Sequence, residues 1–495
     1  MRRGICFSLL LILCLAAVPA TPTRVKVETG GRTMTPQTRD QVYRLIHLHF
    51  EYNVERRFEA AENTLRQALQ LNPDHLMTNY FMANVMEFRG MDDEARRYKA
   101  RVDALMPGAP PAEQIWLRLP QKWRMGKEQV QETHLKLKEL MVQNGSDPVP
   151  FYVAGLFYTT INKQTLAAEC FERALELAPY MGQAHNLLGY TYTYIYKYDL
   201  AIKHLEMYAK LYPDHPNPHD SLGEIYLMTG RYDEAIAQFQ DALDLDPNLD
   251  YVHEHMIQVL NAKGQHTRAM KYAQKMWERA TSSDAKTTAL LQMAEIHHHK
   301  GEYDKALKKA QAALELAPRS PLAYYALGIS NLQSGRMDEL RKLLDAWQKL
   351  IATRQSTDPK DATSMSRYKG DPLYDYLVGR MNTSLGNFST AIELFRKVSD
   401  AIAIPHRAIF ARWALAEAYL ASGQIDLARD VINQNISINP NHAPSLLLKA
   451  KIAAATAQKD EARQLVARCL NVLQDGDKRA PLYQDVKQLS AQLVE

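Results

Sequence analysis

Glu295, His298 and His299 are the residues of this sequence whose types and spacing could do chemistry. They stand at positions i, i+3 and i+4, so on a helix their side chains share one face. Such a face could hold a metal ion if a neighbouring helix supplied the remaining ligands. The related positions in the flanking segments are Gln258 and Gln333, which are poor ligands. We therefore expect no metal site and interpret this face as solvated and polar.

Other signatures of catalysis are missing from the sequence. It has no Gly-x-Ser-x-Gly nucleophile motif, no glycine-rich phosphate loop, no Cys-x-x-Cys pair and no His-Glu-x-x-His motif. The formal net charge is +4 and is not gathered into the basic stripe that nucleic acid would require. We therefore predict no catalytic residue, no cofactor and no nucleic-acid partner.

The elements that must position these side chains belong to a repeat, which is clearest over residues 217–248. Gly223 allows two short helices to approach closely, Tyr226 and Phe239 fill the space around it, and Pro247 ends the second helix. In-phase copies 34 residues earlier and 68 residues earlier carry Gly189 and Gly155 at the same position. One such helix pair cannot bury its own apolar face, so the copies must stack.

This pattern resembles the tetratricopeptide repeat (TPR), a helix–turn–helix unit of about 34 residues. Weaker copies extend the resemblance over residues 42–476, which gives about twelve repeats. The resemblance implies an all-α fold, a right-handed α-solenoid with a capping helix at its C-terminal end. It is specific for fold and unspecific for function, because repeats of this kind host many partners.

The spacing of the copies suggests the domain organisation. Between two late copies the step grows from 34 to 51 residues, which places a loop or hinge at residues 355–371. This predicts an N-terminal TPR block over residues 42–354 and a C-terminal TPR block over residues 372–476. A final helix over residues 477–495 should cap the open end of the array.

The N-terminus has the pattern of a secretory signal peptide over residues 1–20: two arginines, a short apolar run and small residues before Thr21. A polar leader without apolar period follows over residues 21–41 and is expected to be flexible. The pattern favours an exported, bacterial-type protein, periplasmic or secreted, with no membrane span in the mature chain and a peripheral membrane complex as one possible setting. An uncleaved N-terminal anchor is the alternative.

Cysteine usage adds to this interpretation. Removal of residues 1–20 would leave Cys170 and Cys469, which lie in the second helices of repeats far apart in the array. A solenoid could not bring them together, so we interpret both as buried thiols that form no disulfide.

The resemblance also assigns a binding surface. In the TPR family the first helix of each repeat lines the concave face, and set positions of that helix point into it. Carried onto this sequence, these positions are rich in aromatic and acidic residues, which suits the binding of a peptide. The predicted groove residues are Tyr80, Trp116, Tyr152, Asn186, Tyr190, Tyr194, Asp220, Glu224, Glu254, Tyr325, Tyr376 and Trp413. Any one ring could instead pack against an adjacent helix.

We therefore predict a non-catalytic scaffold or adaptor that binds another protein or peptide in an aromatic-lined groove. The positions at which some TPR proteins clamp a chaperone tail lack the paired bases here, so that partner is not expected. Two alternatives stay open. One is an enzyme or metal-binding protein with an unrecognised site around Glu295, His298 and His299, and the other is a structural element that assembles with itself.

Overall fold

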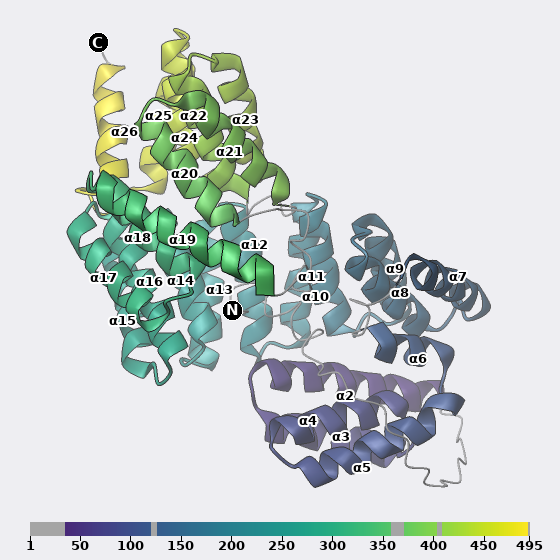
Figure 1. Ribbon diagram of the computed structural model, residues 1–495. Helices are drawn as coiled ribbons and strands as arrows, with labels where there is room; N and C mark the ends of the chain where they lie inside the picture. Colours follow the sequence, from purple (N-terminus) through teal and green to yellow (C-terminus); the bar gives the residue numbers. More distant parts are fainter. Residues whose placement is uncertain (1–34, 120–125, 358–370, 403–407, 494–495) are drawn as a thin grey trace. The chain divides into compact units, whose positions relative to one another are not determined.

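The computed structural model describes residues 35–119, 126–357, 371–402 and 408–493 (Figure 1). Within these ranges the chain forms helices joined by short turns, and no strand occurs there. This confirms the all-α fold class. The predicted signal peptide and most of the predicted leader lie outside the described residues, as does most of the predicted hinge.

The chain divides into an N-terminal unit, residues 1–222, and a C-terminal unit, residues 223–495. The N-terminal unit holds α2 (Pro36–Val54), α3 (Phe58–Leu71), α4 (Leu76–Phe88), α5 (Asp92–Leu105), the short η1 (Met106–Gly108), α6 (Pro111–Arg118), α7 (Lys127–Gln143), α8 (Pro148–Thr160), α9 (Gln164–Leu177), α10 (Gly182–Tyr194) and α11 (Tyr198–Leu211). The division falls within α12 (Pro216–Met228).

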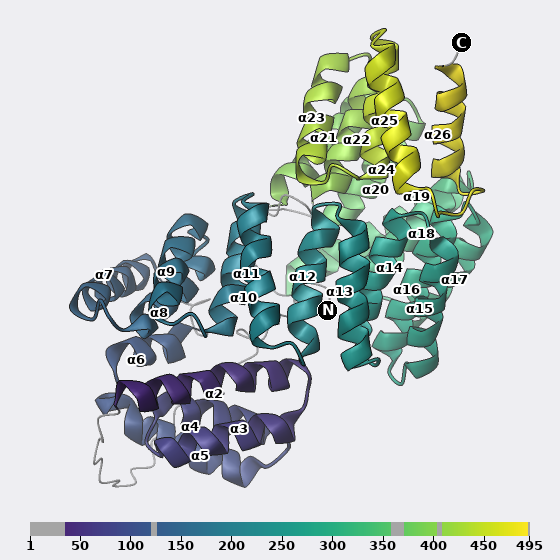
Figure 2. The ribbon, with the colours of Figure 1, turned by 180° about the vertical axis from the view of Figure 1, so that it is seen from behind.

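The C-terminal unit continues the same alternation of first and second helices. It holds α13 (Tyr232–Leu245), α14 (Asp250–Ala262), α15 (His266–Arg279), α16 (Ser283–His299), α17 (Tyr303–Leu316), α18 (Pro321–Gln333), α19 (Met337–Thr357), α20 (Pro372–Ser384), α21 (Phe388–Ala401), α22 (Ile409–Ala421), α23 (Ile425–Ile438), α24 (Ala443–Ala455), α25 (Lys459–Val472) and α26 (Pro481–Gln492). In the described residues, α2 to α25 form consecutive helix pairs of the predicted kind, and α26 follows them against α24 and α25 (Figure 2).

Glycine explains why the two helices of a repeat can lie so close together. A Cβ added at Gly223 would lie 2.5 Å from a ring carbon of Phe239, and one at Gly155 would lie 2.5 Å from a ring carbon of Phe171. Real Cβ atoms do not approach other atoms so closely, so the ring of the second helix packs directly on a backbone without a side chain. This is the packing that the spacing of these residues predicts.

In the described repeats other than that of α6 and α7, the turn ends the first helix with one residue in the left-handed backbone region. Gly230 has φ +75° there, which glycine adopts without strain. The same place in other repeats is taken by Gly90, Gly264, Gly301, Gly335, Gly386 and Gly423, and by the non-glycine residues Arg56, Asn162, Tyr196 and Ala457. The repeat therefore keeps its turn geometry even where its glycine is lost.

The core runs along the array as a row of small and aromatic residues. Ala235 and Phe239 are fully buried in the C-terminal unit, and Ala167 and Phe171 are fully buried in the N-terminal unit. Cys170 and Cys469 are buried free thiols, as predicted, and burial raises the pKa of each to about 12.

Three places depart from the regular repeat. Helix α2 begins at Pro36, inside the segment predicted as a leader, with Thr35 capping its N-terminus. Helix α6 has only 8 residues, which accounts for the weak repeat pattern around it. Helix α19 has 21 residues and extends to Thr357, so the predicted loop 355–371 begins within a helix; residues 358–370 lie outside the described part. None of the helices described here is long and apolar enough to cross a membrane.

Candidate functional site

The twelve predicted groove residues all lie on first helices of the repeats, from Tyr80 on α4 to Trp413 on α22. Half of them are partly exposed and half are buried. Tyr80, Tyr194, Glu224, Glu254, Tyr325 and Trp413 are half-buried. The other six are buried: Trp116, Tyr152, Asn186, Tyr190, Asp220 and Tyr376.

In the N-terminal unit a cluster of rings fills the space between four first helices. The centroids of Phe50 and Phe81 are 5.0 Å apart, those of Phe81 and Trp116 are 6.0 Å apart, and those of Trp116 and Tyr152 are 5.1 Å apart. His47 closes the row at 5.5 Å from Tyr152. Trp116 and Tyr152 therefore pack on other rings in the free chain, which is the alternative that the sequence left open for any one ring.

Two histidine side chains are buried beside these rings. His47 and His49 are fully buried, and burial lowers the pKa of each to about 3 because a charged imidazole would lose its hydration. Both rings are therefore neutral at physiological pH. The rings and imidazoles of this cluster form part of the core of the N-terminal unit.

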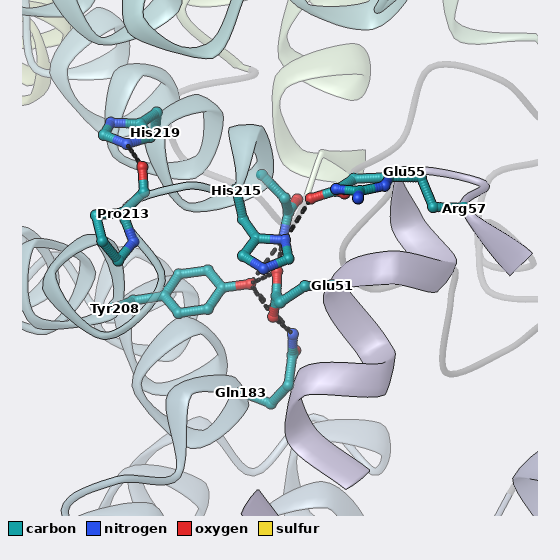
Figure 3. A network of polar contacts seen from close by, with 9 residues as sticks. Glu51, Glu55, Arg57, Gln183, Tyr208, Pro213, His215 and His219 are labelled. Atoms are coloured by element: carbon teal, nitrogen blue, oxygen red, sulfur yellow. Dashed lines mark hydrogen bonds and ion pairs between the residues drawn. The ribbon is translucent and has the colours of Figure 1, made fainter. Parts of the chain in front are cut away.

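A polar network joins helix α2 to residues that follow it by more than 130 positions (Figure 3). The carboxylate of Glu51 is fully buried and accepts hydrogen bonds from Tyr208 Oη at 2.6 Å, Gln183 Nε2 at 2.5 Å and Asn217 Nδ2 at 3.3 Å. Burial raises the pKa of Glu51 to about 7, against the opposing effect of these donors. Beside it, His215 Nδ1 lies 2.6 Å from Glu55 Oε1.

No signal in the sequence singled out Glu51 or Glu55. Each looks like an ordinary polar position at the end of a helix, and its partners, which lie between Gln183 and Asn217, become neighbours only in the folded unit. The network closes the N-terminal unit on itself and leaves Tyr80 and Tyr194 as its half-buried predicted groove residues.

In the C-terminal unit the corresponding helices carry a polar and aromatic strip, which we call the interior strip: Glu295, Tyr325, Tyr376, Arg380, Trp413 and Glu417. The rings of Tyr325 and Tyr376 lie 6.1 Å apart. The guanidinium of Arg380 forms an ion pair with Glu417 and stands 5.1 Å from the centroid of Trp413. Trp413 donates from Nε1 to the carbonyl oxygen of Pro444 at 3.2 Å.

Arg380 was missed from the sequence although a signal for it exists. It follows Tyr376 by four residues, one helical turn, just as Glu417 follows Trp413. Earlier in the unit, burial raises the pKa of Glu254 to about 7, and Glu224 lies 3.5 Å from His255 Nε2. The interior strip itself combines the half-buried rings of Tyr325 and Trp413 with the charged Arg380 and Glu417.

Comparison with known families identifies the repeats. Models of the tetratricopeptide repeat match residues 150–180, 216–249, 291–357 and 409–434. The chain is a tetratricopeptide repeat protein. Repeats of this kind stack to present extended surfaces that bind other proteins, so the chain is a protein-interaction scaffold.

Solved structures with similar helices include a TPR protein from Parabacteroides merdae, at 14% identity over 57% of this chain and 99% of that one, with a TM-score of 0.34. Another is pilF of Pseudomonas aeruginosa, at 17% identity over 43% and 92%, with a TM-score of 0.34. A third is the Cut9 and Hcn1 hetero-tetramer of APC/C, at 13% identity over 93% and 97%, with a TM-score of 0.27. No curated protein matches the sequence significantly.

Glu295, His298 and His299 lie together near the end of α16. Glu295 Oε1 and His299 Nε2 are 3.6 Å apart, and the His299 ring stacks on His266 of α15 at 5.5 Å with an interplanar angle of 4°. Burial lowers the pKa of His298 to about 4. Within the described residues, no three His, Cys, Asp or Glu side chains converge as metal ligands would.

A polar contact joins the start of α15 to Asp477, far along the C-terminal unit, and we call it the closing contact of this unit. Asp477 accepts hydrogen bonds from Thr267 N and Thr267 Oγ1, both at 3.1 Å, and its own backbone N–H donates to the Gly264 carbonyl at 2.8 Å. Asn441 Nδ2 donates to the Gly230 carbonyl at 3.0 Å. A cavity of about 210 Å³ lies next to this contact.

Proposed function

We propose that this TPR protein is a non-catalytic scaffold or adaptor that binds a partner peptide or protein on the interior strip of its C-terminal unit. The observation that carries the proposal is how far the predicted groove rings are exposed. Those of the strip include the half-buried Tyr325 and Trp413, whereas Trp116 and Tyr152 of the N-terminal unit are buried among other rings. A surface must be reachable to bind.

The chemistry of the strip supports a peptide as occupant. Aromatic rings and arginine are the residue types that contribute most to binding energy at protein interfaces. Here Arg380 lies between the Trp413 ring and the Glu417 carboxylate, so its guanidinium is already oriented without help from a partner. Such preorganisation lowers the entropic cost of binding.

The test compares two tryptophans of the same unit. Trp413 belongs to the strip, whereas Trp277 lies on the second helix α15 with 38% of its surface exposed. We expect Trp413→Ala, combined with Tyr325→Ala, to lower recovery of crosslinked partners from a native extract at least tenfold relative to the unsubstituted chain. Trp277→Ala should leave recovery unchanged.

The proposal fails if the two tryptophan variants recover the same partners in the same amounts. It fails as well if partner crosslinks gather on the second helices. Circular dichroism of every variant separates loss of binding from loss of fold.

We further propose that the protein is exported and works in the periplasm or outside the cell. The support is the pattern of residues 1–20 alone. N-terminal sequencing of protein purified from its native cells should begin at Thr21. A chain that still begins at Met1 and pellets with membranes would favour the uncleaved anchor.

A further inference from the structure

The cavity of the C-terminal unit is formed by segments far apart in the sequence. From α14 and α16 it is lined by Gln258, Asn261, Ala262, Glu295 and His299, and from the later part of the unit by His442, Ala443, Pro444, Leu473, Gly476, Asp477, Ala480, Leu482 and Tyr483. Tyr232, Gly264 and His266 complete it. It meets the interior strip at two points, since Glu295 belongs to both and Pro444 accepts the hydrogen bond from Trp413.

The size of the cavity limits what can enter. At about 210 Å³ it is smaller than the ~300–1,000 Å³ typical of sites for drug-sized ligands and cofactors. It has room for one side chain of a bound peptide. Its lining mixes apolar walls with a few polar groups, which is the usual composition of a specificity pocket.

The charges of the lining have one sign. Its carboxylates are Glu295 and Asp477, and no lysine or arginine is among the described residues that line it. Burial is the largest influence on His266 and His442 and lowers the pKa of each to about 4, so both imidazoles are neutral at physiological pH. The Glu295 side chain is 52% exposed, so desolvation raises its pKa less than the neighbouring His299 and His298 lower it, and the pKa of this carboxyl is lowered.

Two lysines stand beside the cavity, and one of them, Lys478, contacts two residues of its lining. Lys478 Nζ lies 4.5 Å from the Tyr483 ring centroid and donates to the Leu473 carbonyl at 3.3 Å. Lys300 Nζ lies 3.8 Å from Glu302. The position of Lys478 also shows that the Tyr483 ring accepts a cation on its face.

One polar atom of the lining has no partner. Asn261 accepts a hydrogen bond on Oδ1 from His266 Nδ1 at 3.1 Å, while its Nδ2 is buried without a hydrogen bond to any described residue. A buried donor left unpaired is destabilising, and an incoming acceptor would remove that cost. The carbonyl oxygen of a peptide is such an acceptor.

We propose that this cavity is a specificity pocket for a cationic side chain, lysine or arginine, of the peptide that crosses the interior strip. The carboxylates of Glu295 and Asp477 attract the charge, and Asn261 donates to the backbone beside it. The inference rests on the proposed function, because it names the residue that the partner must present there.

The test uses the full chain and a library of fluorescent nonapeptides in which the central residue is fixed in turn as Arg, Lys, Gln or Glu. We expect the Arg and Lys pools to bind at least tenfold more tightly than the Glu pool at low salt. Glu295→Gln should reduce that preference at least threefold, and raising the ionic strength should reduce it further. Glu302→Gln removes a carboxylate that pairs with His297 outside the cavity, so it should leave the preference intact.

The possible results separate the pocket from the proposed function. Binding that depends on Trp413 and Tyr325 but shows no basic preference overturns the pocket and leaves the proposed function standing. A preference for Arg and Lys that survives Glu295→Gln also overturns the pocket. If no pool binds to any form of the chain, both proposals fail.

Discussion

The two units use one repeat to build different interiors. In the N-terminal unit the inward positions of α2, α4, α6 and α8 hold rings that pack on one another, and the closing contact is a fully buried carboxylate, Glu51. In the C-terminal unit the same positions hold a half-buried strip with an Arg380 ion pair, and the closing contact is the half-buried Asp477. The first interior stabilises itself, and the second leaves charged and aromatic groups for a partner.

The comparison is sharpest for large side chains, and truncating Tyr152 should show its largest effect. Tyr152 is 2% exposed, so we expect Tyr152→Ala to destabilise the N-terminal unit by about 3–5 kcal/mol, as Phe239→Ala should destabilise the C-terminal unit. Hydrogen exchange measured by mass spectrometry reports the opening free energy of each helix. Phe88→Ala is the control, since that ring is 56% exposed and its loss should cost under about 1 kcal/mol. Equal effects of Tyr152→Ala and Phe88→Ala would show that the interior is open.

Acid should lower the stability of the N-terminal unit through protonation of His47. Its pKa is about 3 in the folded chain and about 6.5 when unfolded, so below pH 6.5 the unfolded state binds a proton that the folded state does not. Stability is therefore lost as the pH falls from 6.5 towards 3. Glu51 acts in the opposite sense, because its raised pKa makes the folded state gain stability as the pH falls from about 7 to 4.5.

Replacing the imidazole isolates its contribution. Between pH 7 and pH 4.5, the free energy of unfolding should fall by about 2–3 kcal/mol less in the His47→Phe variant than in the unsubstituted chain. Urea titrations at the two pH values, followed by exchange in α2 and α8, measure the difference. Parallel pH dependence of the two chains would mean that His47 is hydrated in the folded state.

The sequence predicted the repeat and not the difference between its two uses. Glycine under a ring, as at Gly223 and Phe239, is a local signal, so the helix pairs and the assignment of groove positions to first helices could be predicted. Whether an inward ring is buried depends on residues that meet over long separations. Glu51 reaches Tyr208 across 157 residues, and no local pattern contains that information. Arg380 could have been found by the four-residue spacing, whereas the cavity beside Asp477 could not.

The smallest expected effect concerns the closing contact of the C-terminal unit. Asp477 accepts from Thr267 N and Oγ1 near the start of α15, where a carboxylate also interacts favourably with the helix dipole. Asp477→Ala removes these bonds at a partly exposed place, so water replaces them and the cost should be about 1–2 kcal/mol. Hydrogen exchange at the Thr267 amide should become correspondingly faster, while exchange in α21 stays unchanged.

The control is Asp475→Ala, at an exposed position two residues earlier, which should alter neither the stability nor the exchange at Thr267. If Asp477→Ala instead loosened the whole unit, the contact would be as central to its stability as Glu51 is to the N-terminal unit, and the contrast between a buried and a solvated closure would not hold.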